Sequence, residues 1–253
     1  MITFKMKALS IAVLGLAGLG MAGSVFAACP TDPAQPNGAW ASKTSLLGSV
    51  AITSPGLNST SCALQVSLNQ SSPILAKAFV TDTSPNNESR YRARFYFDTT
   101  ELTGLDNALK QVPIFTAAAA TSPAATASDE VKAILIGGAT PSLRIVVADS
   151  NQGSKFQSVT IPLPTAFGVN RFEFDLTQGT TGSVRYWLSA AGTATSDGSP
   201  LGTLNVNNSG WGGVKQASMG MFSASTNYRN NVPSTQHLYL DEFDSRRQTF
   251  IGQ

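Results

Sequence analysis

The sequence contains few of the residues from which metal sites and many catalytic sites are built. Its 253 residues include two cysteines, Cys29 and Cys62, and one histidine, His237. These side chains cannot form a structural zinc site, which needs more cysteine and histidine ligands than the chain has. The sequence also has no Gly-x-Ser-x-Gly motif and no Walker-type phosphate loop. Zinc-dependent, nucleotide-dependent and serine-hydrolase chemistry therefore have no local signature here.

Charged residues are also scarce and make up 13% of the chain. The chain carries 17 lysines and arginines against 15 aspartates and glutamates. Lys5 and Lys7 lie in the first 27 residues, which contain no acidic residue, so the formal charge without that segment is zero. A neutral chain has no long-range attraction for nucleic acid or for an anionic membrane. We therefore expect neither as a partner.

Long apolar runs are limited to one, at residues 8–26. Lys5 and Lys7 precede this run, glycines interrupt it, and it closes on Val25-Phe26-Ala27, a pattern that signal peptidase cleaves. The sequence predicts a signal peptide at 1–27, a secreted protein, and no transmembrane segment in the mature chain. The alternative is an uncleaved membrane anchor, but the run is short and rich in glycine.

The two cysteines offer two interpretations. In an oxidising compartment, Cys29 and Cys62 would form a disulfide. Closing the loop between them would stabilise the fold by roughly 3–4 kcal/mol. Alternatively, Phe26-Ala27-Ala28-Cys29 is similar to a bacterial lipobox, in which Cys29 would be acylated and anchor the protein to a membrane. Phe26 departs from the aliphatic residue usual there, and acylation would leave Cys62 as an odd thiol. The disulfide is therefore favoured.

Apolar residues at helical spacing are lacking over any long stretch, whereas period-2 alternation recurs. The clearest examples are residues 90–97, 171–176 and 184–188. Turn-forming clusters rich in Asn, Gly, Ser and Pro separate these runs. The pattern predicts an all-β, two-sheet antiparallel sandwich of roughly ten to fourteen strands. Further runs that we interpret as strands lie at 74–80, 131–136, 143–148, 156–161, 217–222 and 237–243.

We expect one domain, at 46–253, preceded by an extended arm at 28–45 that is rich in Pro, Asn and Ser. Residues 117–128 have low complexity and are interpreted as a surface loop. A short helix is expected at 102–110. No internal repeat is found, and the strand patterns on either side of 117–128 are incomplete without each other.

The order of motifs resembles a known family. Tyr-Arg-Ala-Arg-Phe-Tyr-Phe-Asp at 91–98 is followed by Arg-Phe-Glu-Phe-Asp at 171–175, then Val-Arg-Tyr-Trp-Leu at 184–188, and a last strand at 238–245 contains Asp-Glu-Phe. This order is similar to the concanavalin A-like, laminin-G-like jelly rolls of secreted bacterial proteins. The resemblance covers roughly 46–253 and implies a jelly-roll sandwich. Lectins, carbohydrate-binding modules, glycanases and adhesion domains share that fold, so it leaves the activity open.

Three arginines project from one face of the strand at 90–97. Like charges on one face repel unless neighbouring strands supply partners, and Glu173 and Asp175 could do so. The functional alternative is a basic and aromatic face that grips a glycan or an acidic ligand. The candidate ligand-binding residues on this face are Arg90, Arg92, Arg94, Tyr96, Arg185 and Trp187.

Trp211 lies in the glycine-rich segment 207–213. An indole face stacks on the C–H surface of a sugar, and the neighbouring asparagines offer donors and acceptors for hydroxyl groups. Trp211 is therefore a further candidate for ligand binding. The alternative is an aromatic plug that closes one end of the sandwich.

Catalytic candidates are incomplete. Glycoside hydrolases need two facing carboxylates. Glu173 and Asp175 begin a Glu-x-Asp pattern, but the second glutamate of that pattern does not follow. Strand alternation would place Glu242 and Asp244 on one face, with Asp241 and Phe243 on the other.

His237 and Tyr239 could form an acid–base pair of the kind that polysaccharide lyases use. We assign no catalytic residue. For a metal, Asp82, Asp98 and Asp241 are candidates for a structural calcium ion by residue type alone, and no other cofactor is expected.

Together these features predict a secreted, non-catalytic binding module that recognises carbohydrate or a surface polymer. One alternative is a polysaccharide hydrolase or lyase of the same fold. The other is a structural protein of the envelope or matrix.

Overall fold

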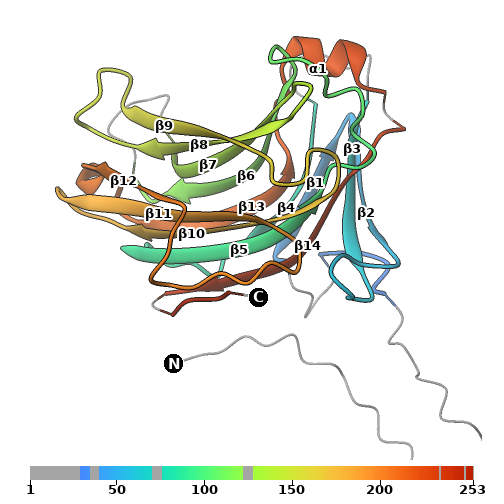
Figure 1. Ribbon diagram of the computed structural model, residues 1–253. Helices are drawn as coiled ribbons and strands as arrows, with labels where there is room; N and C mark the ends of the chain where they lie inside the picture. Colours follow the sequence, from blue (N-terminus) through green and yellow to red (C-terminus); the bar gives the residue numbers. More distant parts are fainter. Residues whose placement is uncertain are drawn as a thin grey trace, which may run out of the picture.

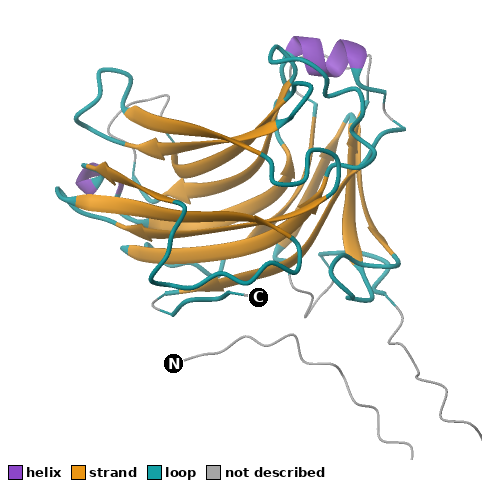
Figure 2. Cartoon of the chain, in the orientation of Figure 1, coloured by secondary structure: helices purple, strands orange, loops and turns teal. Residues whose placement is uncertain are grey.

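The computed structural model describes residues 29–34, 40–69, 76–121, 128–233, 235–247 and 249–252. These residues form two stacked antiparallel sheets, with strands β6–β9 above strands β5 and β10–β12 in the view of Figure 1. Figure 2 shows how little helix the chain contains. The predicted signal peptide lies outside the described residues.

Each sheet has seven strands. The predicted all-β, two-sheet antiparallel sandwich is therefore confirmed. Sheet A has the order β1 (Ser42–Leu46), β4 (Lys77–Asp82), β13 (Val214–Met221), β6 (Gln111–Ala119), β7 (Asp129–Ile136), β8 (Ser142–Ala148) and β9 (Phe156–Pro162). Sheet B has the order β12 (Gly202–Val206), β11 (Gly182–Ala190), β10 (Val169–Thr177), β5 (Arg90–Asp98), β14 (Leu238–Arg246), β3 (Ala63–Leu68) and β2 (Gly48–Thr53).

The core lies between the sheets and is rich in phenylalanine. Phe95 of β5 stacks on Phe115 of β6, with ring centroids 5.2 Å apart, and Phe115 also contacts Phe174 of β10 at 5.5 Å. All three side chains are fully buried. Each contributes about 2–3 kcal/mol by leaving water. The inward half of the period-2 pattern thus joins the two sheets.

The predicted helix at 102–110 is wrong. The segment forms successive turns in which the Leu102 N–H donates to Thr99 and the Leu105 N–H donates to Leu102. Both leucines are buried in the core, so their three-residue spacing imitates a helical face. The α-helix is instead α1 (Thr226–Asn231), which Ser225 caps by accepting the N–H of Tyr228.

The structure also changes the limits of two irregular segments. β1 begins at Ser42, inside the segment that we expected to be an extended arm, and β6 runs through Ala119, so the start of the low-complexity segment is strand. Residues 122–127 lie outside the described residues.

The predicted Cys29–Cys62 disulfide is confirmed. Within the described residues, no helix is long and apolar enough to cross a membrane.

Candidate functional site

The predicted ligand-binding arginines line the outer face of sheet B, where they form a buried ion network. Arg92 lies 3.1 Å from Glu173 and 2.7 Å from Asp197, and its side chain is 1% exposed. Its guanidinium also lies between the rings of Trp187 and Phe250, 4.8 and 4.9 Å from their centroids. A buried charge needs such partners, because an unpaired one would be strongly disfavoured.

Two distant segments cover this network. Residues 249–252 lie over Glu173, whose carboxylate accepts the backbone N–H groups of Ile251 and Gly252, both at 3.1 Å. Arg94 donates to the carbonyl of Gly252 at 3.1 Å. The β11–β12 loop covers the other side, where Trp187 donates to the carbonyl of Ser196. The face that looked most like a binding surface is therefore largely closed.

Only the rim of this face is open. Arg90 and Arg185, whose side chains are 40% and 28% exposed, both donate to Asp175. Burial raises the pKa of Asp175, but the hydrogen bonds from Arg90 and Arg185 and the charge of Arg92 outweigh it and hold that pKa below its ordinary value. Tyr96 is fully buried. Of the predicted set on this face, Arg90 and Arg185 are the accessible members.

Trp211 is also fully buried, in a small apolar cluster with Ala119, Ala148 and Phe156. It ends the short 3-10 helix η1 (Ser209–Trp211), which lies between β12 and β13. Its indole therefore packs against strands of sheet A, at the position expected of a plug at the end of the sandwich. The ligand-binding role of Trp211 stays a prediction.

A buried carboxylate whose hydrogen-bond donors are neutral lies beside this plug, and no charged group of the described residues pairs with it. Glu130 of β7 accepts hydrogen bonds from the side-chain amides of Gln178 and Asn208, at 3.1 and 3.3 Å, and from the backbone of Gly213. Burial raises the pKa of Glu130 to about 7, and these neutral donors offset only part of that effect. Glu130 thus ties three loops together at this end of the molecule.

Glu242 and Asp244 lie on one face, as expected, but the expected pairing of Asp241 with Phe243 on the other face is wrong, because a β-bulge interrupts the pairing of β14 with β5. Phe243 packs into the core against Phe115, with ring centroids 6.3 Å apart. Asp241 faces the other way, in register with Tyr96, and Glu242 lies 3.6 Å from Arg94 on that same side. One extra residue resets the alternation of a strand. Asp241 and Phe243 therefore lie on opposite faces.

His237 and Tyr239 do meet, through a third residue. Glu101 lies 2.7 Å from Nδ1 of His237 and accepts the hydroxyl of Tyr239 at 2.5 Å. Gln65 donates to the same hydroxyl at 3.1 Å. Burial and Glu101 raise the pKa of Tyr239, which opposes a role for this tyrosine as a base.

The carboxylates of the three aspartates considered for calcium accept hydrogen bonds from other groups of the protein. Asp82 accepts hydrogen bonds from Ser84, and Asp98 accepts them from Thr100. Asp241 accepts the backbone N–H groups at 57 and 242. In the described part of the chain, no group of three or more His, Cys, Asp and Glu side chains could hold a metal ion.

The open surface is the outer face of sheet A, which the sequence did not single out. A groove of about 410 Å³ crosses strands β4, β13, β6 and β7 there. Phe79 and Phe222 stack on each other at its edge, with ring centroids 4.6 Å apart, and both are half-buried. Gly220 lies directly opposite Phe79, where a Cβ would collide with the carbonyl of Ala78. A glycine is thus required for β13 to approach β4 closely beneath the aromatic pair.

Ser218 and Thr116 line the floor of this groove, and Ser218 is almost fully buried. Thr81, which is also buried, lies next to Ser218 but does not line the groove. Thr81, Ser218 and Thr116 are directly paired across β4, β13 and β6, and the row continues to Lys132 of β7. The hydroxyls of Thr81 and Ser218 are 3.0 Å apart. The row spans three inter-strand spacings, or about 14 Å. A flat, polar floor beside an aromatic edge is suited to an extended ligand that lies across the strands.

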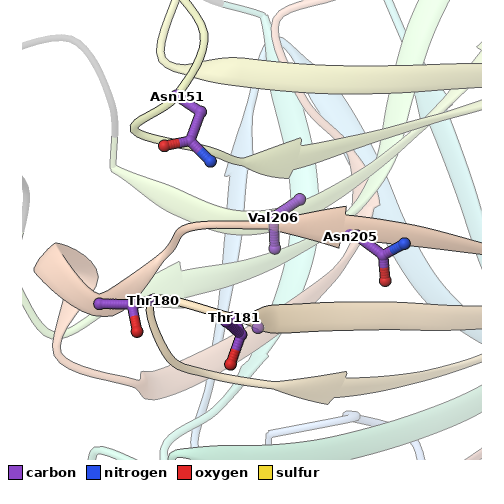
Figure 3. A pocket seen from close by; sticks show the side chains of 6 residues that line it. Asn151, Thr180, Thr181, Asn205 and Val206 are labelled. Atoms are coloured by element: carbon purple, nitrogen blue, oxygen red, sulfur yellow. The ribbon is translucent and has the colours of Figure 1, made fainter.

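A second, smaller pocket of about 360 Å³ lies where the ends of the two sheets meet (Figure 3). Asn151 projects toward it from the β8–β9 loop, Thr180 and Thr181 border it on the β10–β11 turn, and Asn205 lies on the edge strand β12. Its lining contains no aromatic or charged side chain. It therefore lacks the stacking surface that the groove on sheet A has.

The residues that the sequence analysis missed are Phe79, Phe222, Lys132 and Lys215, all of which line the groove. Phe79 and Phe222 lie within runs that we interpreted as strands, so alternation placed them on a face. The sequence did not show that β4 and β13, which are far apart in the chain, are neighbours in the sheet and so bring these two phenylalanines together. No local motif marks such a pair.

No protein-family model matches this chain, and no curated protein matches its sequence. Solved structures do share its fold. An endo-β-1,4-glucuronan lyase from the fungus Trichoderma reesei superposes with a TM-score of 0.58 at 14% identity, over 83% of this chain and 92% of the lyase. A carbohydrate esterase from a Shiga toxin-encoding bacteriophage gives 0.52 at 9% identity, over 82% of this chain and 90% of the esterase. Such identities show a common fold alone.

Proposed function

We propose that this chain is a non-catalytic binding module that holds a carbohydrate in the groove on sheet A. The observation that carries the proposal is the half-buried Phe79–Phe222 pair beside the hydroxyl residues Ser218 and Thr116, all of which line the groove. Aromatic faces pack against the C–H surface of a sugar ring. Hydroxyls act as donor and acceptor at once, which is what sugar hydroxyls require.

Two further observations are compatible with this role. The fold neighbours include a glucuronan lyase and a carbohydrate esterase, so the same architecture serves proteins that act on carbohydrates. The Cys29–Cys62 disulfide agrees with a protein that works outside the cytoplasm, where disulfides persist. We therefore propose an extracellular or periplasmic glycan or surface polymer as the ligand.

Glycan-array binding followed by titration calorimetry tests the proposal. Phe222→Ala and Phe79→Ala should each weaken binding about tenfold, since an aromatic anchor is worth more than about 1 kcal/mol. Phe167→Ala removes an exposed phenylalanine that does not line the groove, and it should bind like the wild type. Binding of no glycan by the wild-type protein would reject the proposal and favour a structural role in the envelope or matrix.

The second candidate function is a polysaccharide hydrolase or lyase, which the Glu101–His237–Tyr239 cluster favours. Incubation of the wild-type protein with a panel of polysaccharides should then release reducing ends or unsaturated products. His237→Gln and Tyr239→Phe would abolish that release if the cluster is catalytic. We expect no turnover, because neither of the two pockets is lined by His237 or by two carboxylates in the described part of the chain.

The predicted role of the sheet B arginines can be tested in the same assay. Arg90→Gln and Arg185→Gln change the two accessible members of the set without emptying the buried network. If the rim of sheet B binds the ligand, these variants should lose affinity while Phe222→Ala keeps it. The opposite result would place the site in the sheet A groove.

A further inference from the structure

The sheet A groove carries an excess of positive charge although the predicted mature chain is neutral. Lys132 and Lys215 line the groove, and Lys77 lies with its Nζ 5.9 Å from the ring centroid of Phe79. Asp129 is the one carboxylate among the lining residues. The local field at a site, rather than the net charge of the chain, decides which ligands it attracts.

The lysines differ in how far they are neutralised. Lys132 forms an ion pair with Asp129 at 2.9 Å, and its side chain is 34% exposed. The lysine ion pairs among the described residues are those of Lys43, Lys110 and Lys132, so Lys77 and Lys215 take part in none. Two ammonium groups at the groove are thus available to an anionic ligand, and a third is shared with Asp129. On sheet B, by contrast, several carboxylates already neutralise the arginines.

The positions of these lysines match a ligand that crosses the strands. Lys132 ends the hydroxyl row on β7, while Lys215 and Lys77 lie toward the two ends of the groove along β13 and β4. A polymer that lies beside Phe79 and follows the row to Lys132 would therefore pass ammonium groups on three sides. Each is a compact, flexible point charge that pairs with carboxylate or sulfate groups alike.

We infer that the ligand of this groove is an acidic glycan, one whose carboxylate or sulfate groups pair with Lys132, Lys215 and Lys77. This inference rests on the proposed function, that the groove binds carbohydrate. It adds the chemical class, because a neutral glycan would leave the lysines without a role in binding. The net neutrality of the predicted mature chain implies that this preference depends on the groove and is not a general affinity for polyanions.

Matched polymer pairs test the inference. Polygalacturonate and its methyl ester share one backbone and differ in carboxylate charge, while dextran sulfate and dextran form the corresponding sulfated pair. The wild-type protein should bind one acidic member at least about fivefold more tightly than its neutral partner, and that ratio should fall at about 0.5 M salt. The pair that shows the larger ratio identifies the acidic group.

Variants locate the preference. Lys215→Gln and Lys132→Gln should each reduce the ratio of acidic to neutral affinity by roughly two- to fivefold, with Lys132→Gln the stronger because it leaves Asp129 unpaired in the groove. Lys155→Gln changes a lysine on the β8–β9 loop, away from the groove, and should keep the wild-type ratio.

The outcomes distinguish a failure of the acidic preference from a failure of the proposed carbohydrate binding on which it rests. Equal binding to the acidic and neutral members, lost in Phe222→Ala, would overturn the acidic preference and leave carbohydrate binding standing. An acidic preference that survives in the Lys132→Gln, Lys215→Gln double variant would also overturn the inference, since other residues would then supply it. Binding to none of the four polymers would reject both.

Discussion

The outer faces of the two sheets have opposite characters. The face of sheet B carries five arginines on β5, β10 and β11, and most of them are buried beneath residues 249–252 and the β11–β12 loop. The face of sheet A has hydroxyls, one aromatic pair and few charges, and it is open. A dense cluster of charge is therefore not by itself evidence of a binding site. Here the charges attach the protein's own segments, and the less conspicuous face is the one with an open groove.

The largest expected effect tests whether the sheet B charges are structural. Arg92→Met keeps the aliphatic length but leaves the fully buried Glu173 without its cation. We expect the free energy of unfolding to fall by about 3–5 kcal/mol, measured by urea denaturation. On the open face, Lys132→Met should change it by no more than about 1 kcal/mol, because that ion pair is partly exposed. Equal losses in the two variants would contradict the contrast between the faces.

The pH dependence of stability sharpens the comparison, because two particular buried carboxylates, Asp175 with arginine partners and Glu130 with neutral hydrogen-bond donors, should respond oppositely. The pKa of Glu130 is raised from 4.5 to about 7 in the fold. The stability that the protonated form of Glu130 contributes is thus fully present below pH 4.5, the ordinary pKa of a glutamate, and is lost as the pH rises through about 7. A tenfold change in a protonation equilibrium corresponds to about 1.4 kcal/mol, so roughly 3 kcal/mol of stability is at stake.

Unfolding free energies measured from about pH 2 to pH 8 check this. Glu130→Gln should remove the loss at rising pH, because a neutral amide does not titrate. Asp175 has a lowered pKa, so its contribution is present above the ordinary value and is lost as the pH falls. Asp175→Asn should therefore flatten the acid side of the profile instead. An unchanged slope in Glu130→Gln would show that its carboxyl is not the responsible group.

The smallest effect concerns the segment that covers sheet B. Phe250→Ala removes the ring that contacts Arg92 and Trp187, and it should lower the free energy of unfolding by about 1–2 kcal/mol. Phe222→Ala, on the open face, should cost less than this but should weaken glycan binding. The reverse pattern, in which Phe250→Ala loses binding and keeps stability, would move the site to sheet B.

Much of the fold could be predicted from the sequence because alternation is a local property. The run at 90–97 correctly separates core residues such as Phe95 from outward residues such as Arg92. Prediction failed where the local pattern was ambiguous. Leu102 and Leu105 repeat every three residues without forming a helix, and the bulge after Asp241 shifts the alternation by one residue. No propensity marks a bulge of this kind.

The candidate site was not predictable in the same way. Its aromatic pair joins Phe79 to Phe222, and the network on the opposite face joins Arg92 to Asp197 and Phe250. Each of these contacts depends on the order of strands in the sheets and on where distant loops return. A sequence shows that a residue points outward, but it does not show what covers that residue.

By itself, the sequence determined the class of the fold and favoured the pairing of Cys29 with Cys62, because period-2 alternation and cysteine number do not depend on distant contacts. Only the tertiary structure decided which face is open. Residues 249–252 and the β11–β12 loop return to cover sheet B, where buried charges need partners, whereas no segment of the described chain fills the groove on sheet A.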